Sequence, residues 1–309
     1  MKRCYPPAMS SMRGIAAGIG YSVIFGFSFM MTKETLEILS PVELLAARFL
    51  IAALLMSALV ALGAIHVDFR AKSLKLLALM CLSQPVAYFI FETYGIANSA
   101  TNVAGIILGA LPAGVAIMGA FVLGERLTAI QSVGLATSVV GVMFVALFGR
   151  GNTAETRAIG VLFLTGAMLS AVLFNVVSKK AAETFSPTER TFAMMWSGAI
   201  CFGVPALWQN VTGKGHLSVL FGALEGRVAA AWGGILYLGT LSSVAAFFLI
   251  NYSLTYLKAS QSAVFTNLVT VITVLAGIFI RHEAFSWSQG ASLGLIVLGI
   301  AVANAKGAT

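Results

Sequence analysis

Nearly unbroken runs of apolar residues alternate along the chain with short polar breaks rich in charges, serine, proline and asparagine. Each run is long enough to cross a bilayer, which takes about 20 residues of helix. Continuous apolar runs indicate helices rather than barrel strands, because a helix satisfies its own backbone groups in lipid. The pattern predicts an all-α integral membrane protein with ten transmembrane helices, over residues 14–31, 43–63, 74–95, 99–121, 129–148, 158–178, 188–210, 230–253, 259–280 and 287–305.

The composition agrees with that fold and excludes several classes of protein. Of the 309 residues, 59% are hydrophobic and only 10% are charged, whereas a soluble domain is about 45–50% apolar and about 25% charged. A soluble enzyme, a disordered scaffold and a secreted disulfide module are therefore excluded. The three cysteines, Cys4, Cys81 and Cys201, lack metal-ligand spacing, so no disulfide or zinc site is expected. No cleavable signal peptide is expected, because the first apolar run is long enough to span.

The distribution of basic residues predicts the orientation of the chain. Lysine and arginine exceed the acids by eight, but they stand singly between apolar runs, which is not the pattern of nucleic-acid binding. One set of alternate breaks holds Lys2, Arg3, Arg13, Arg70, Lys72, Lys75, Arg126, Lys179, Lys180, Arg190, Lys258 and Lys306. The other set holds Lys33, Arg150, Arg157, Lys214, Arg227 and Arg281. Cytoplasmic loops are enriched in Lys and Arg, so both termini are expected in the cytoplasm.

An internal repeat divides the chain into two similar halves. Ser40-Pro41-Val42-Glu43 opens the second predicted helix, and Ser186-Pro187-Thr188-Glu189 opens the seventh. Further matches, in the same order, are Lys33 with Lys179, Glu37 with Glu183, Leu82-Ser83 with Leu241-Ser242, Tyr88-Phe89 with Phe247-Phe248, Glu125 with Glu283, Gln131 with Gln289 and Gly141 with Gly299. We expect two units, residues 1–155 and 156–309, in one membrane domain. Because each unit holds five helices, an odd number, the second is inverted relative to the first.

The matched motifs have the form of helix starts. In Ser-Pro-x-Glu the serine caps the helix, the proline takes the first helical position and the glutamate bonds back to the cap. Thr128–Gln131 and Ser286–Gln289 predict further capping boxes at the fifth and tenth helices. Such caps satisfy backbone amides before the chain enters hydrocarbon. We therefore interpret these Ser, Pro and Gln residues as helix terminators.

The inverted repeat favours transport over catalysis. Secondary transporters are often built from two inverted halves that open a shared site to either side of the membrane. A membrane enzyme needs paired carboxylates, a histidine cluster or an activated nucleophile, whereas His66, His216 and His282 lie in predicted loops and Glu92 is the single acid identified inside a helix. No Walker motif and no filter-like loop appears. We expect a transporter without a cofactor or metal.

Six short motifs mark the ends of predicted helices and the fourth helix itself. They are Ala47-Arg48-Phe49, Asn98-Ser99-Ala100-Thr101, Leu111-Pro112, Leu123-Gly124-Glu125-Arg126, Lys258-Ala259-Ser260 and Arg281-His282-Glu283. With the duplicated five-helix pattern they resemble the drug/metabolite transporter superfamily, specifically its EamA-type members. In the second half the chain departs from this pattern, because Val271 takes the place of Pro112, and whether the helix is kinked there stays open. The resemblance implies a bacterial inner-membrane transporter of small metabolites with a central cavity between the halves.

Two charged residues stand out inside the predicted helices, where an ionisable side chain is costly and by default functional. Arg48 and Glu92 are expected at comparable depth, so they can pair. Their counterparts in the second half are Met194 and Asn251, so both charges are absent there. Two interpretations stay open: a structural ion pair, or a cavity-facing Glu92 that binds a cation or a proton during transport. Tyr88, one turn from Glu92, adds an aromatic ring suited to an amino group.

Other polar residues inside the helices are candidates for the cavity wall. Besides Tyr88 and Glu92, the candidate substrate-binding residues are Asn102, Asn175, Tyr237, Asn251, Tyr252 and Asn267, with Tyr21, Gln84 and Gln261 as further candidates. Taken singly, each is more often a helix–helix hydrogen bond. Pro85 and Pro112 are expected to bend their helices, and Gly105 and Gly109 to let helices approach closely.

Secondary transport by alternating access is the expected function. The preferred form is a proton-coupled exporter of small metabolites such as amino acids, amines or toxic organic compounds, working in the bilayer as a monomer or homodimer. An importer or exchanger of organic cations and a lipid-carrier flippase of the same fold are the alternatives.

Overall fold

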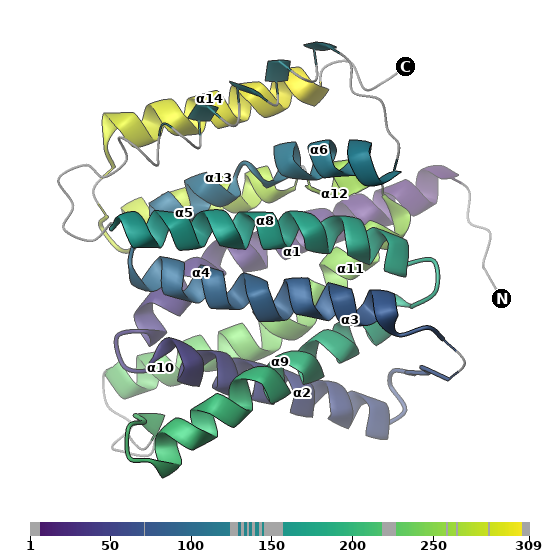
Figure 1. Ribbon diagram of the computed structural model, residues 1–309, viewed down its shortest axis with the longest axis vertical. Helices are drawn as coiled ribbons and strands as arrows, with labels where there is room; N and C mark the ends of the chain where they lie inside the picture. Colours follow the sequence, from purple (N-terminus) through teal and green to yellow (C-terminus); the bar gives the residue numbers. More distant parts are fainter. Residues whose placement is uncertain are drawn as a thin grey trace.

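The computed structural model describes residues 7–70, 72–123, 157–217, 227–257, 259–263, 265–283 and 285–304, with short pieces between 129 and 144. Within these residues the regular structure is all helical. The helices lie side by side, and successive spans run in opposite directions (Figure 1). Among the described residues, seven helices are long and apolar enough to cross a membrane, and Thr266–Phe279 is apolar but shorter. The chain is therefore an all-α, multi-pass membrane protein.

In the first half, α1 (Pro7–Thr35) and α2 (Pro41–Ala61) are continuous. The third predicted helix consists of α3 (Lys75–Cys81), the π-helical segment η1 (Leu82–Ala87) and α4 (Tyr88–Ala97). The fourth consists of α5 (Thr101–Leu108) and α6 (Leu111–Leu123). The fifth predicted helix and its cap at Thr128 lie largely outside the described residues.

The second half follows the same order. It contains α8 (Ala158–Ala181), α9 (Pro187–Val211), and then α10 (Arg227–Leu236), the π-helical segment η3 (Tyr237–Ala246) and α11 (Phe247–Tyr256). The last elements are α12 (Ala259–Ala263), α13 (Thr266–Phe279) and α14 (Trp287–Asn304). Helices fill every predicted range except the fifth, and the count of ten stays a prediction.

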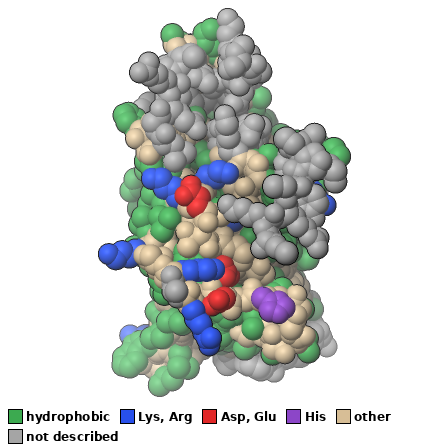
Figure 2. All heavy atoms as spheres, turned by 90° about the vertical axis from the view of Figure 1, so that its right-hand side faces the viewer, with side chains coloured by type: hydrophobic (Ala, Val, Ile, Leu, Met, Phe, Trp, Pro, Cys, Tyr) green, Lys and Arg blue, Asp and Glu red, His purple; other side chains and the backbone are tan. Residues whose placement is uncertain are grey.

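The two ends of the bundle differ in charge. The first turn of α1 and the last turn of α14 lie on the right in Figure 1, and we call this the proximal end and the opposite one the distal end. Figure 2 shows the proximal end, where basic side chains outnumber acidic ones. By the course of the helices, the proximal end holds the described basic residues Arg13, Arg70, Lys72, Lys75, Lys179, Lys180 and Arg190, and the distal end holds Lys33, Arg157, Lys214 and Arg281.

The predicted capping boxes are confirmed wherever the structure describes them. Ser40 Oγ accepts from the Glu43 amide while the Glu43 carboxylate accepts from the Ser40 amide, and Ser186 and Glu189 do the same at α9. Ser286–Gln289 forms the corresponding box at α14. Each box satisfies orphan amides at a helix start, so these residues terminate helices as expected.

The two halves pack on each other in a reciprocal way. The first helix of the first half, α1, packs against η3, α11 and α13, while the first helix of the second half, α8, packs against α3, α4, α5 and α6. The caps are reciprocal too. Glu43 accepts from the His216 amide in the segment after α9, and Glu189 accepts from Lys72 Nζ (2.8 Å) and the Asp68 amide (3.1 Å) in the segment after α2.

Two lysines cap the C-terminal ends of corresponding helices in the two halves. Lys33 Nζ donates to the carbonyl oxygens of Ile96 (3.2 Å) and Ser99 (2.7 Å) at the end of α4. Lys179, its match in the repeat, donates to the last turn of α11, including the Leu257 carbonyl at 2.7 Å. A cation is favourable there because the last carbonyls of a helix lack intrahelical partners and carry the negative end of its dipole.

Four spans are interrupted near their middle. Gln84 has a non-helical backbone (φ −151°, ψ 119°) immediately before Pro85, and η3 is π-helical. Breaks also separate α5 from α6 and α12 from α13. The last break lies between Ala263 and Thr266, whereas Val271, which takes the place of Pro112, lies inside α13. These interruptions lie where the two halves meet, and they surround the cavity described next.

Candidate functional site

A cavity of about 60 Å³ lies in the middle of the bundle, which is several times the roughly 10–15 Å³ that one water molecule needs. Both halves contribute to its wall. The polar residues that line it are Tyr21, Ser28, Gln84, Tyr88, Glu92, Asn175, Ser242 and Thr266. Apolar side chains, among them Phe25, Phe29 and Phe89, cover most of the remaining wall. The cavity is thus a largely apolar chamber with a few polar groups, which is the usual form of a small-molecule site.

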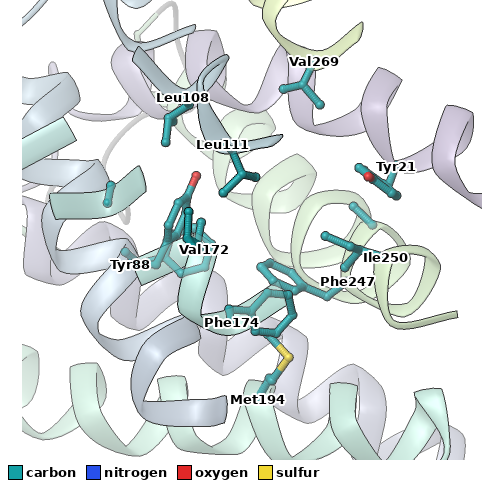
Figure 3. Packing of buried hydrophobic residues seen from close by; sticks show 14 of the residues in the cluster. Tyr21, Tyr88, Leu108, Leu111, Val172, Phe174, Met194, Phe247, Ile250 and Val269 are labelled. Atoms are coloured by element: carbon teal, nitrogen blue, oxygen red, sulfur yellow. The ribbon is translucent and has the colours of Figure 1, made fainter. Parts of the chain in front are cut away.

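Local structure around η1 brings three of these residues into the chamber. The helical path breaks at Gln84 and resumes as α4 at Tyr88. Tyr88 and Glu92 are four residues apart and therefore share one face of α4. The Tyr88 hydroxyl points toward Leu108 and Leu111, the residues on either side of the break between α5 and α6 (Figure 3). The interrupted helices thus place the phenol and the carboxyl at one chamber.

Glu92 is the one acidic residue among the lining residues described, and it is 2% exposed. Its Oε2 atom has no hydrogen-bond partner within the described part of the chain. A buried carboxylate oxygen without a hydrogen-bond partner is costly, and native structures keep few of them.

Arg48 is bonded to the second half of the molecule rather than to Glu92. Its Nε donates to Ser243 Oγ and its Nη2 to Ser242 Oγ, each at 3.1 Å. The guanidinium also lies 4.3 Å from the centre of the Phe89 ring. Arg48 and Glu92 lie close enough to attract each other, but no ion pair joins them among the described side chains. The expected direct pair is therefore replaced by hydrogen bonds to two serines of η3, one of which lines the chamber.

Aromatic rings surround the carboxyl group. Tyr88 and Phe89 make an edge-to-face contact at 4.9 Å, and Phe25 contacts Phe247 at 5.3 Å. Tyr21 meets the Phe25 ring at 5.9 Å. Ring faces attract organic cations, and a desolvated site strengthens that attraction.

The structure brings together some of the sequence candidates and separates others. Tyr88, Glu92 and Asn175 line the chamber, as do Tyr21 and Gln84. The side chains of Asn102 and Gln261 are not among those that the structure describes. The candidates that lie away from the chamber wall are Tyr237, Asn251, Tyr252 and Asn267.

Tyr237 and Asn251 bond to neighbouring helices, and Tyr252 packs against rings of its own helix. Tyr237 donates to the Ile24 carbonyl at 2.8 Å. Asn251 donates to Thr191 at 3.1 Å and accepts from Ser178 at 2.9 Å. Tyr252 packs against the rings of Phe248 and Tyr256. Polarity marks these positions in the sequence, but the helix face on which they lie decides their role.

The expected bending and packing residues lie around the breaks. Pro85 follows the non-helical Gln84, and Pro112 lies in the first turn of α6, where no amide donor is needed. Gly105 and Gly109 face α13: an added Cβ would lie 3.0 Å from Thr273 Cγ2 and 2.8 Å from Thr270 Oγ1 respectively. Close approach of α5 and α13 therefore depends on these two glycines.

Three charged residues are more buried than the sequence indicates. Glu43 and Glu189 are 0% and 5% exposed, so Glu92 is not the single buried acid. Arg190, assigned from the sequence to a cytoplasmic break, is 0% exposed and bonds to the carbonyls of Ser178 and Asn251 at 3.0 and 2.6 Å. Their positions along the chain gave one sign of this burial, because each residue falls in the first helical turn after a Ser-Pro cap.

Ser28, Ser242 and Thr266 line the chamber without having been predicted to do so. Small hydroxyl residues inside apolar runs carry little signal of their own, because such residues commonly bond within their own helix. Within the described residues no group of three or more His, Cys, Asp or Glu is arranged to hold a metal.

The sequence model of the EamA-like transporter family matches residues 12–147 and again residues 158–305. A Bacillus subtilis protein named as the transporter YcxC is 32% identical over 93% of this chain and 91% of its own. A protein of Streptantibioticus cattleyicolor named "probable terminal-alkyne amino-acid exporter" is 25% identical over 71% of this chain and 66% of its own. A solved crystal structure shares the fold with a TM-score of 0.66 and 19% identity, covering 96% of this chain and 97% of that one.

Proposed function

The chain belongs to the EamA-like transporter family, and from this premise we propose that it is a secondary transporter whose substrate is a small positively charged or amino-bearing metabolite. The substrate occupies the chamber around Glu92, and the two halves expose that chamber alternately to the two sides of the membrane. The chemistry lies in binding and release, so no bond in the substrate is made or broken.

Alternating access is supported by the relation between the halves. The family model matches the chain twice in succession, and α1 and α8 pack on corresponding helices of the opposite half. Lys33 and Lys179 close corresponding helix ends. Two similar units in opposite orientation have two exchanged arrangements of similar energy, which is the basis of an inward-open and an outward-open state.

The single observation that carries the proposed substrate is the unpartnered Oε2 of Glu92 on the wall of an aromatic chamber. One carboxylate takes either one proton or one cationic group. Competition between the two couples the substrate to the proton gradient: a proton that binds Glu92 from one side releases the substrate there. Proton-coupled export is therefore the preferred form of transport. We place the protein in a bacterial inner membrane with both ends of the chain in the cytoplasm.

The test is transport by the purified protein in liposomes, with and without an imposed pH gradient. Radiolabelled amino acids, primary amines and quaternary ammonium compounds are screened for uptake. We expect uptake of at least one amino-bearing class, accelerated by a gradient that is acidic on the side of release. A rate independent of the gradient would exclude proton coupling, and a preference for anionic metabolites would exclude the substrate class.

The variant Glu92→Gln tests whether Glu92 is the residue that couples uptake to the pH gradient. The amide keeps the size of the carboxyl and removes its charge, so we expect at least a tenfold loss of gradient-driven uptake. The matched control is Glu183→Gln, because Glu183 is exposed at the proximal end and does not line the chamber. Equal amounts of inserted protein are verified for both variants. Full gradient-driven activity in Glu92→Gln contradicts the proposal.

A further inference from the structure

Five buried side-chain atoms lack a hydrogen-bond partner in the part of the chain that the structure describes. One is the Nε of Arg190, at the proximal end. The other four are Glu92 Oε2 and the hydroxyls of Thr32, Thr93 and Thr101. An unpartnered buried polar atom is costly, and native structures keep few of them. These four belong to α1, α4 and α5, which pack against one another.

The three threonines continue the cavity wall toward the distal end. Residues spaced by four or seven positions lie on the same face of a helix. Each threonine has this spacing from a residue that lines the chamber. The pairs, given from the chamber toward the distal end, are Ser28 and Thr32 on α1, Phe89 and Thr93 on α4, and Leu108 and Thr101 on α5. We call Thr32, Thr93 and Thr101 the threonine seam.

The seam reaches an ion cluster at the distal end. Arg281 lies between three carboxylates: its Nη2 is 3.3 Å from Glu37, its Nη1 is 3.8 Å from Glu34 and its Nε is 3.7 Å from Glu283. Glu283 in turn accepts from the backbone amide of Thr101 at 2.9 Å. The cluster therefore ties the ends of α1 and α13 to the start of α5, and these helices all line the chamber.

The proximal side of the chamber is closed differently. Tyr21 donates to the Ser262 carbonyl at 2.6 Å, and Ser22 donates to the Phe265 carbonyl at 2.8 Å. Gly18 packs directly on the Phe265 ring, which occupies the space of any larger side chain there. These hydroxyls are fully partnered and the contact is otherwise apolar. Only the distal side combines unpartnered hydroxyls with an ionic closure, within the described residues.

We propose that the distal passage between the chamber and the membrane surface runs along the threonine seam, and that the cluster around Arg281 closes it in the conformation described. This rests on the alternating access proposed above. When α1 and α13 separate at their distal ends, the hydroxyls gain as partners water and the ammonium group of the passing substrate. In the cluster itself three carboxylates surround one guanidinium, and Lys33 bonds to the neighbouring carbonyls of Ile96 and Ser99.

Thiol labelling tests the passage without any need for transport. Thr32→Cys, Thr93→Cys and Thr101→Cys are made singly in a chain whose Cys4, Cys81 and Cys201 are replaced by serine. A membrane-impermeant thiol reagent is applied to both sides of proteoliposomes. We expect slow labelling with Arg281 present and labelling at least tenfold faster when Arg281→Gln opens the cluster. Glu34→Gln combined with Glu37→Gln opens it independently and is expected to act in the same direction.

Thr191→Cys is the matched control. Thr191 is also 0% exposed, but its hydroxyl is partnered by Pro187 and Asn251. Its labelling is expected to stay unchanged in the Arg281→Gln background. Unchanged labelling at the seam, or an equal increase at Thr191→Cys, overturns the proposed passage. Because labelling needs no substrate, it separates this outcome from failure of the proposed substrate class, which the uptake assays decide.

Discussion

Buried charges in this protein are held in two different ways. Arg48 and Arg190 are both about 0–1% exposed, and each donates to hydroxyls or carbonyls of a neighbouring helix. Glu92 has an oxygen atom without such a partner. Both arginines therefore have partners within the fold, whereas one oxygen atom of Glu92 has none among the described residues.

The electrostatic link between Arg48 and Glu92 gives a prediction at this scale. Arg48→Met introduces the residue that the second half has at the matching position, and it leaves Glu92 without its nearby cation. We expect a loss of about 3–5 kcal/mol in the free energy of unfolding. In the double variant Arg48→Met, Glu92→Gln the uncompensated acid is removed too, so about 0.5–3 kcal/mol of that loss is recovered. Denaturation of all four proteins in detergent measures the cycle.

Lys75→Met provides the control for charge removal as such, because Lys75 is exposed at the proximal end and no ion pair of its own is found among the described residues. Its stability is expected to stay close to that of the unchanged protein. Strictly additive effects of the two substitutions in the double variant contradict an interaction between Arg48 and Glu92.

The sequence singles out Glu92 and Tyr88, which both line the chamber, because a charge inside an apolar run is rare and a four-residue spacing fixes a shared helix face. It does not separate them from Asn251 or Tyr237, which are equally polar but face helices rather than the chamber. Arg190 is misplaced for a related reason. Its position next to a helix cap suggests a loop in the sequence, while the fold buries it against the ends of two other helices.

At the scale of helices, the lysine contacts predict matching effects in the two halves. Lys33→Met and Lys179→Met each remove an ammonium group that bonds to two terminal carbonyls. Hydrogen bonds to a charged group contribute about 1.5–3 kcal/mol. We expect both variants to lose about that amount of stability, with similar shifts in the thermal denaturation midpoint in detergent.

Lys180 supplies the matched control for that pair. It follows Lys179 directly but is exposed, so Lys180→Met is expected to change the midpoint little. A shift for Lys33→Met without one for Lys179→Met shows that the two halves are not built alike at these ends. Equal shifts of the midpoint in all three variants show that loss of a positive charge, and not loss of the bonds to the terminal carbonyls, causes the change in stability.

The interruptions of the helices are only partly visible in the sequence. Pro85 marks the break before α4, because proline lacks an amide donor and disfavours a helical residue before it. The second half breaks between α12 and α13 and turns π-helical at η3 without any proline. There the departure from the α-helix is set by tertiary packing, for example by Tyr237 bonded to α1. Local sequence carries no record of such a contact.

For the whole molecule, the repeat and the charge asymmetry lead to the same arrangement. The duplicated Ser-Pro-x-Glu motif predicts that α2 and α9 start at opposite ends, and the structure places Glu43 at the distal end and Glu189 at the proximal one. This much follows from the sequence because caps and apolar length are local properties. The chamber does not, since its wall combines residues far apart along the chain, such as Ser28 and Ser242.

The excess of Lys and Arg at the proximal end predicts how the molecule lies in a cell membrane. Basic residues are retained on the cytoplasmic side, so the proximal end faces the cytoplasm. Lys180 and Lys214 are exposed at the proximal and distal ends respectively. In the cysteine-free chain, Lys214→Cys is expected to react with a membrane-impermeant thiol reagent added to intact spheroplasts, and Lys180→Cys only after the membrane is permeabilised. Reaction of both before permeabilisation, or the reverse order, contradicts the orientation. The expected result fixes the distal passage on the outer side, so a substrate that leaves past Arg281 is exported.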